Sequence, residues 1–356
     1  MITNSFVFNA PVEGHYQTQW QAPSNIALIK YWGKHGQQLP QNPSLSFTLS
    51  KCVTTTAVSF SPRRKGDKVF DFLFEKKKQV EFHPKINEFL DQVIPYFPGL
   101  EVYHLSISSQ NSFPHSSGIA SSASAMAALA LCIVDFERQF HMDWSPQAAL
   151  QKASFLARLG SGSGSRSIKG PLMVWGKNKS FPQSNDQFAI SPSIQLHPIF
   201  QEYQDTVLIV DKGKKKISST VGHGLMQGHT FALQRFEQAH KNLEQLKTAL
   251  IVGDLELFID LTEAEALTLH AMMMTSNPRY MLMQPNTLSI LQKIWDYRDQ
   301  TGRPLSFTLD AGANVHLLYP KKDRLPIIEF IQRELIFYCQ GGQFIEDQVG
   351  NGAKKV

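Results

Sequence analysis

A lysine stands inside the apolar segment NIALIKYWGK, at residues 25–34. If this segment is a strand, its side chains alternate between two faces, and Lys30 and Lys34 share one of them. Burying an ammonium group is costly unless an anion pairs with it, although a lysine can also extend its amine to the solvent. The fold must therefore give Lys30 either an acidic partner or access to water.

The size and charge of the chain restrict its class. A length of 356 residues exceeds what one hydrophobic core usually organises, so we expect two domains. Hydrophobic residues make up 42% of the chain and charged residues 18%, as in globular proteins. The net charge of +5 suits an anionic small molecule and is too diffuse to indicate nucleic-acid binding.

The cysteines and the apolar segments indicate the compartment. Cys52, Cys132 and Cys339 are too far apart for a disulfide framework or a CxxC metal pair. The N-terminal segment lacks the basic and apolar regions of a signal peptide. The longest apolar stretch, residues 125–134, is too short to cross a bilayer. We therefore expect a cytoplasmic protein with no membrane partner.

Hydrophobic periodicity predicts a mixed α+β fold. The segment KVFDFLFEKKKQVEFHP is expected to form a hairpin with EKKKQ as its turn, and a short helix from residue 86 is expected to end near Pro95. A polar, proline-containing stretch predicts a boundary between domains 1–203 and 204–356. The expected strands include 45–50, 53–60, 171–177 and 206–211, and the other expected helices are 118–140, 147–159, 230–250, 255–273, 288–298 and 326–338.

A run of small and hydroxylated residues, PHSSGIASSASA, begins at Pro114. Gly118 permits backbone conformations that are closed to other residues. Ser117, Ser121 and Ser122 can donate hydroxyl groups. The N-terminus of the helix expected next offers unpaired N–H groups and partial positive charge, which favour an anion such as phosphate. A small-residue helix packed against a sheet accounts for the same residues equally well.

A glycine- and serine-rich turn, GSGSGSRS, occupies residues 160–167, and we expect it to be flexible. The Arg166 guanidinium can bind a phosphate or carboxylate through two parallel hydrogen bonds. Taken alone, a solvated arginine in a surface loop is the simpler interpretation.

The segment TLDAGANVH places Asp310 at the end of an apolar strand and before a glycine turn. A carboxylate there can face a cleft, although aspartate is also common in turns for structural reasons. His223 and His229 lack the spacing of a metal site, and the sequence contains no HExxH motif. We predict no metal-ligating side chains.

In this order, the motifs resemble those of the GHMP kinase superfamily and, within it, the mevalonate diphosphate decarboxylase family. PHSSGIASSA resembles the phosphate-binding motif of the superfamily, and NIALIKYWGK resembles a segment highly specific to the decarboxylases. SGSGSRS and DAGAN are similar to the family's Ser-Gly-Ser…Arg-Ser loop and its Asp-Ala-Gly-Pro-Asn turn. The resemblance covers nearly the whole chain.

The resemblance implies a GHMP kinase-like two-domain fold with an active-site cleft between the domains. It implies that ATP and Mg²⁺ are used to decarboxylate (R)-5-diphosphomevalonate to isopentenyl diphosphate, with ADP, phosphate and CO₂, in isoprenoid biosynthesis. A homodimer is also implied, with no nucleic-acid partner.

The resemblance also implies roles for individual residues. Asp310 would accept the proton of the substrate's tertiary hydroxyl, and Lys30 would lie beside it and keep it ionised. The implied substrate-binding residues are Tyr31, Lys34, Ser161, Ser163 and Arg166. The implied ATP-binding residues are Pro114, Ser117, Gly118, Ala120, Ser121 and Ser122.

The chain departs from the family motifs at several positions. Ala313 replaces the proline of the aspartate turn, and we expect a less rigid turn. Gly164 and Ser165 replace an Ala-Cys pair, and we expect a looser phosphate loop. Residues 115–117 replace a Thr-Ala-Ala segment and are more similar to the kinases.

Alternative functions stay open on the sequence alone. A decarboxylase of mevalonate 5-phosphate and a GHMP kinase that does not decarboxylate would share this architecture. Mevalonate 3-kinases are expected to lack the pair of Lys30 and Asp310, so its presence favours decarboxylation. A non-catalytic nucleic-acid-binding protein is a further alternative, because the GHMP N-terminal fold is related to such domains.

Overall fold

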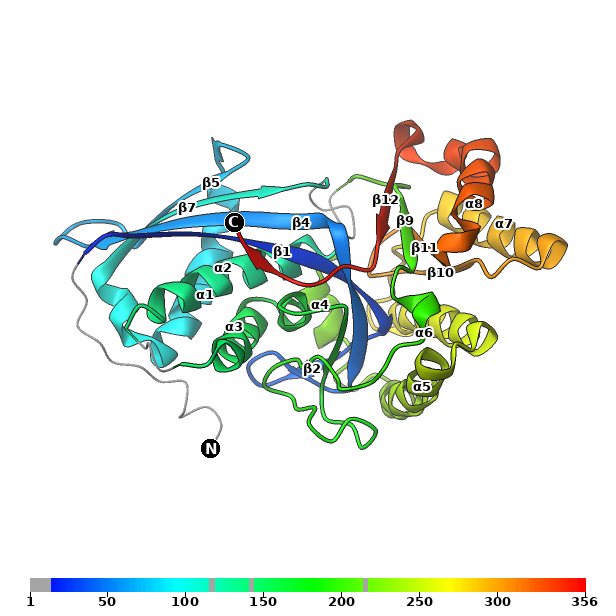
Figure 1. The fold of residues 1–356 in the computed structure, drawn as a ribbon, viewed down its shortest axis with the longest axis horizontal. Coiled ribbons are helices and arrows are strands. Elements are labelled where there is room, and N and C mark those ends of the chain that lie inside the picture. The colour runs from blue at the N-terminus through cyan, green and yellow to red at the C-terminus, as the bar shows by residue number, and fades with distance from the viewer. Residues whose placement is uncertain (1–13, 115–118, 141–143, 214–216) are drawn as a thin grey trace.

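The computed structural model describes residues 14–114, 119–140, 144–213 and 217–356. Figure 1 shows a larger lobe built on a seven-stranded sheet and, beside it, a smaller lobe built on a four-stranded sheet. Helices of the larger lobe lie along one face of its sheet. The predicted α+β class is confirmed by this arrangement.

The larger sheet has the order β13-β1-β4-β7-β5-β6, and β8 also pairs with β4. Segments 45–50 and 53–60 were expected to be separate strands, but they form one long strand, β4. The hairpin expected at KVFDFLFEKKKQVEFHP is present in a shorter form: β5 pairs with β6, which lies inside the expected turn EKKKQ, and the expected second strand is a 3₁₀ turn at Val80–Phe82. The strands are β1 (Tyr16–Ile29), β4 (Ser44–Pro62), β5 (Phe70–Phe74), β6 (Lys77–Lys78), β7 (Tyr103–Asn111), β8 (Leu172–Trp175) and β13 (Lys354–Lys355).

Three helices cover this sheet: α1 (His83–Val93), α2 (Ser121–Glu137) and α3 (Pro146–Gly160). α3 begins where the Ser145 hydroxyl accepts a hydrogen bond from the Ala148 N–H, at 3.1 Å, and proline follows the cap. The small residues of α2, such as Ala127 and Ala130, are fully buried. The small-residue run is therefore a packing helix, and its N-terminus is still available to a ligand.

The smaller sheet has the order β10-β11-β9-β12 and is antiparallel throughout its described pairs. The helix expected at 326–338 is present as a continuous helical segment, but only its first part is α-helical: α8 ends at Phe330, a π-helical turn follows at Ile331–Leu335, and a 3₁₀ turn follows at Ile336–Tyr338. The elements are β9 (Gln204–Leu208), α4 (Ser219–Gly224), α5 (Ala232–Val252), α6 (Leu255–Thr275), α7 (Pro285–Thr301), β10 (Ser306–Thr308), β11 (Val315–Tyr319), α8 (Arg324–Phe330) and β12 (Phe344–Gln348).

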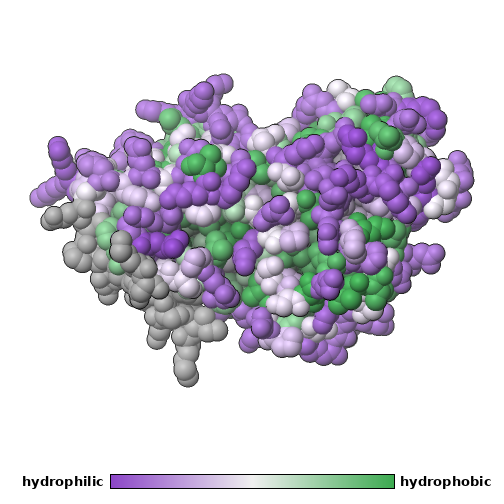
Figure 2. All heavy atoms as spheres, viewed as in Figure 1, coloured by the Kyte–Doolittle hydropathy of each residue, from purple (hydrophilic) through white to green (hydrophobic). Residues whose placement is uncertain are grey.

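One hydrophobic cluster is shared by the two lobes. Ile26 of β1 and Phe47 of β4 belong to the same cluster as Leu243 of α5 and Phe258 of α6. Figure 2 shows hydrophilic side chains over the outer parts of both lobes and hydrophobic side chains nearer the middle of this face. None of the helices in the described segments is long and apolar enough to span a bilayer.

The end of the chain connects the smaller lobe to the larger sheet. After β12, the chain returns and β13 pairs with β1. Asp347, on β12, lies against a bulge in β4, where the pairing with β1 shifts. Its carboxylate accepts hydrogen bonds from the N–H groups of Ser50, Lys51 and Cys52, at 3.0, 2.8 and 2.6 Å. Asp347 thus satisfies the backbone donors that the bulge leaves unpaired.

Replacing Asp347 should therefore weaken the fold. We expect Asp347→Ala to lower the free energy of unfolding by about 2–4 kcal/mol, because three N–H donors lose a charged acceptor. Asp347→Asn keeps one acceptor oxygen, so its free energy of unfolding should fall by less than that of Asp347→Ala. Urea denaturation gives the measurement, with Glu346→Ala as the matched control, since Glu346 makes only a half-exposed ion pair with Arg324. Equal stability of the two alanine variants would contradict this account.

Candidate active site

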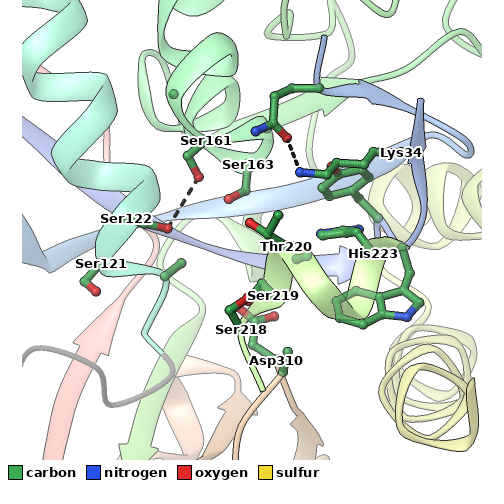
Figure 3. Close-up of a pocket in the computed structure, with 18 of the residues that line it drawn as sticks. Lys34, Ser121, Ser122, Ser161, Ser163, Ser218, Ser219, Thr220, His223 and Asp310 are labelled. Atoms are coloured by element: carbon green, nitrogen blue, oxygen red, sulfur yellow. Dashed lines mark hydrogen bonds between the residues drawn. The ribbon is translucent and has the colours of Figure 1, made fainter. Parts of the chain in front are cut away.

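A cavity of about 570 Å³ lies between the lobes. In Figure 3 the start of α2 and the serine-rich turn line one side, and Asp310 lies across from Lys34 with His223 of α4 between them. The predicted site residues that line the cavity are Lys30, Tyr31, Lys34, Ala120, Ser121, Ser122, Ser161, Ser163, Arg166 and Asp310. Pro114 is not part of this lining, and the predicted residues Ser117 and Gly118 lie outside the described residues.

Lys30 and Asp310 form an ion pair across 280 positions of the sequence, with Nζ 2.9 Å from Oδ1. The Lys30 side chain is 2% exposed and that of Asp310 is 24% exposed, so the aspartate is the more accessible member of the pair. Burial lowers the pKa of Lys30, and the nearby carboxylates of Asp310 and Glu265 oppose this shift. The expected pairing of Lys30 with Asp310 is confirmed, and its catalytic role stays a prediction.

The backbone of Lys30 is held by a second ion pair. β1 ends at Ile29, so the strand alternation expected over residues 25–34 is wrong from Lys30 onward. The Lys30 N–H donates to Glu265 at 2.8 Å, and the Lys30 carbonyl accepts from Arg235 at 3.0 Å and from Asn42 at 2.9 Å. Arg235 also donates to Glu265 at 2.9 Å, and both side chains are buried. The peptide of Lys30 thus hydrogen bonds to α5 and α6 and not to a neighbouring strand.

The serine-rich turn is a buried 3₁₀ segment, Gly162–Ser167, and not the flexible loop that was expected. Within it Arg166 is 3% exposed. Its Nε donates to Ser46 at 3.1 Å and to Asn25 at 3.3 Å, and its Nη1 donates to Ser44. Burial lowers the pKa of Arg166 to about 10, which leaves the guanidinium charged at neutral pH. These neutral partners fix Arg166 without neutralising its charge.

Gly164 allows this turn to pack closely against the helices. A Cβ at Gly164 would lie 3.1 Å from the carbonyl oxygen of Ala157 and 3.2 Å from that of Ala123. The expectation that Gly164 loosens the turn is therefore wrong, since the missing side chain permits a tighter contact.

Asp310 lies in the turn between β10 and β11. Its carbonyl oxygen accepts hydrogen bonds from the His270 ring at 3.1 Å and from the Gly312 N–H at 2.7 Å. The Thr287 hydroxyl donates to the Ala313 carbonyl at 2.7 Å. Hydrogen bonds from α6 and α7 thus hold the turn where the family has a proline.

The start of α2 forms another wall of the cavity. Ala120, directly before the helix, has a left-handed backbone with φ of 45°, and no described side chain caps the helix. The Ser122 hydroxyl lies 3.4 Å from that of Ser161, which joins α2 to the serine-rich turn. An uncapped N-terminus flanked by hydroxyl groups can accept an anion, as the sequence predicted.

A second, largely apolar cavity of about 420 Å³ adjoins the first. The two cavities share the residues Lys85, Ser121, Ser122, Ser218 and Ser219. The apolar walls of the second cavity include Phe72, Phe74, Phe82, Ile86, Ile107, Met126 and Leu129. Its volume and lining suit a partly apolar group that is joined to anionic groups in the first cavity.

Sequence reasoning missed several residues of the first cavity, among them Lys85 and Glu88 of α1, Thr220 and His223. The signal for α4 was present, because Ser218 can cap a helix and its hydroxyl accepts the Val221 N–H at 3.3 Å. His223 was considered only as a metal ligand. Within the described part of the chain, no group of three or more acidic, histidine or cysteine residues could hold a metal ion.

Two family models match most of the chain. The diphosphomevalonate decarboxylase-like N-terminal domain matches residues 22–189, and the mevalonate 5-diphosphate decarboxylase C-terminal domain matches residues 206–354. The diphosphomevalonate decarboxylase of Schizosaccharomyces pombe is 28% identical over 324 residues, which is 85% of this chain and 79% of the relative.

Solved structures are similar over almost the whole chain. The mevalonate diphosphate decarboxylase of Staphylococcus aureus is 28% identical with a TM-score of 0.82, covering 96% of this chain and 98% of that one. That of Enterococcus faecalis is 28% identical with a TM-score of 0.81, covering 96% and 99%. A complex described as MDDEF with MVAPP, AMPPCP and magnesium has the same identity and a TM-score of 0.82, covering 96% and 99%. The chain therefore belongs to the mevalonate diphosphate decarboxylase family and has its GHMP kinase-like two-domain α+β fold.

Proposed function

We propose that Asp310, Lys30 and Arg166 carry out the ATP-dependent decarboxylation of (R)-5-diphosphomevalonate to isopentenyl diphosphate. The observation that carries this proposal is the 2.9 Å ion pair between Lys30 and Asp310, in a cavity that Arg166 also lines. Family membership supplies the substrate and the reaction. The roles of the individual residues rest on the geometry and on the resemblance of the motifs.

The reaction can be assigned to these groups step by step. The Asp310 carboxylate accepts the proton of the substrate's tertiary hydroxyl. The hydroxyl oxygen attacks the terminal phosphorus of ATP at the same time, and ADP leaves. The new phosphate then departs with the C–O bonding electrons. The C–C bond to the carboxylate breaks, CO₂ is released and the electron pair forms the alkene. Lys30 neutralises Asp310 and holds it in place throughout.

ATP fits the two adjoining cavities. The apolar cavity suits the nucleobase, and the residues shared by both cavities, which include Lys85, Ser121 and Ser219, would face the phosphates. The uncapped start of α2 supplies N–H donors for them. Bound Mg²⁺ would neutralise phosphate charge, held by the phosphates together with the hydroxyl and carboxylate groups of this cavity.

The substrate's anionic groups would be held by the remaining predicted residues. Arg166 is fixed by neutral partners, so its charge is available to a carboxylate or a phosphate. Tyr31, Lys34, Ser161 and Ser163 line the same cavity and can donate hydrogen bonds. The mixture of fixed cations and hydroxyl groups suits a substrate with three anionic groups.

We also propose the organisation of the chain as 1–203 and 204–356, a homodimeric assembly and a cytoplasmic location. The domain division is supported by the two sheets. β13 is the exception, because it lies in the segment 204–356 but pairs with β1 of the larger sheet. The dimer follows only from the family resemblance. A cytoplasmic location is supported by three buried, unpaired thiols.

The activity itself is tested by offering Mg-ATP with mevalonate, its 5-phosphate and its 5-diphosphate in turn. We expect ADP, inorganic phosphate and CO₂ in equal amounts with the diphosphate. ADP without CO₂ would instead identify a kinase that stops at the phosphorylated product. Turnover only with the 5-phosphate would identify the monophosphate decarboxylase.

Asp310→Asn should lower kcat by roughly 10²–10⁴-fold, because the amide cannot accept the hydroxyl proton. The protein should still fold and bind ATP, which a thermal-shift titration with ATP can verify. Near-normal turnover in this variant would exclude Asp310 as the base.

Arg166→Gln should raise the KM for the substrate by about 10-fold or more while the KM for ATP changes little, because a charge-assisted contact to the substrate is lost. Initial rates at varied concentrations of each substrate give both constants. Ser163→Ala, in the same turn, serves as the milder comparison. Equal changes in both KM values would contradict a role confined to the substrate.

A further inference from the structure

The ring of His223 forms part of the cavity wall and packs, at tilted angles, against two aromatic side chains. Its centroid lies 4.2 Å from that of Tyr31 and 4.4 Å from that of Trp32. His223 is 9% exposed and lines the first cavity. In the view of Figure 3, it lies between Lys34 and Asp310.

A backbone hydrogen bond defines which nitrogen of this ring carries a proton. The Gly33 N–H donates to Nδ1 of His223 at 3.0 Å. Nδ1 is therefore the acceptor, and the neutral ring carries its proton on Nε2. Among the residues that the structure describes, none accepts a hydrogen bond from this Nε2–H. The donor is thus available to a ligand in the cavity.

Two glycines hold the ring in this orientation. Gly33 has a φ of +96°, and a Cβ there would lie 3.1 Å from Phe236. A Cβ at Gly222 would lie 2.7 Å from the Trp32 ring, so only glycine lets α4 pack this closely. The position of the imidazole is therefore set by the backbone before a substrate binds.

The surroundings of His223 keep the ring neutral. Burial lowers its pKa to about 3, and the nearby cations of Lys34 and Arg166 act in the same direction. The imidazole consequently presents an N–H donor, and no charge, at any pH from about 5 upward.

We propose that the Nε2–H of His223 donates a hydrogen bond to the diphosphate of the substrate, beside Lys34. This proposal rests on the proposed function. The reacting end of the substrate belongs at Asp310, which acts electrostatically on both Lys30 and Arg166. Lys34 is the cation that acts most strongly on His223, and Figure 3 shows it across the cavity from Asp310. An extended substrate would therefore present its phosphate end to Lys34 and His223.

Steady-state kinetics of two variants test this role. His223→Phe keeps the aromatic contacts but has no N–H, and we expect the KM for diphosphomevalonate to rise by about 10-fold, as for one hydrogen bond to a charged group. The KM for ATP should stay within about twofold of the wild-type value. His223→Gln keeps an N–H donor and should recover most of the affinity. An unchanged KM for diphosphomevalonate in the phenylalanine variant overturns the proposal. An equal rise in the KM values for diphosphomevalonate and ATP also overturns it.

Ring ¹⁵N NMR of the unmutated chain gives a measurement that does not depend on the folding of a variant. At pH 7, Nδ1 should show the shift of an unprotonated acceptor. The Nε2–H resonance should move when diphosphomevalonate is added without ATP, and it should move much less with mevalonate 5-phosphate. A resonance that does not respond overturns the inference. If the chain releases no CO₂ with Mg-ATP and substrate, the proposed function fails, whereas turnover without a ring response removes only this inference.

Discussion

The geometry of the ion pair between Lys30 and Asp310 depends on how the peptide of Lys30 is held. A strand would normally satisfy that peptide through a neighbouring strand, but here Glu265 accepts its N–H and Arg235 donates to its carbonyl. The two helices that carry these side chains belong to the smaller lobe, which also contributes Asp310 through the turn after β10. One buried ion pair therefore fixes the backbone of Lys30 in the lobe that also positions its side-chain partner.

The cavity combines fixed cations with neutral hydrogen-bond partners. Arg166 is oriented by two serines and an asparagine, and Lys34 by Gln38, so neither loses its charge to a carboxylate. Among the cationic residues that line the first cavity, Lys30 has a close carboxylate partner, at Asp310. A polyanionic ligand supplies the missing negative charge, so its binding stabilises the folded chain. The strength of this attraction falls as the ionic strength rises.

The candidate site residues could be predicted where a single sequence segment contains the relevant motif. The lysine inside an apolar run demanded a partner, and the motif around Asp310 supplied one. The hydrogen bond from the Lys30 N–H to Glu265 was not predictable, because Glu265 lies 235 positions away. The sequence of its helix is typical of an ordinary core helix. Arg166 was predicted as a ligand residue, but its burial was not, since a Gly-Ser sequence resembles a flexible loop until Asn25 and Ser46 close around it. Likewise, nothing in the sequence around His223 shows that the Gly33 N–H will reach its ring.

The hydrophobic cluster shared by the lobes limits how the molecule can move. Ile26 and Phe47 pack in one cluster with Leu243 and Phe258, and all four side chains are almost fully buried. A hinge that swung the lobes apart would expose this surface to water, at about 25 cal/mol for each Å² of apolar area. Domain closure of the kind seen in hinged enzymes is therefore unfavourable. Substrate entry and product release are then expected to involve displacements smaller than a hinge motion.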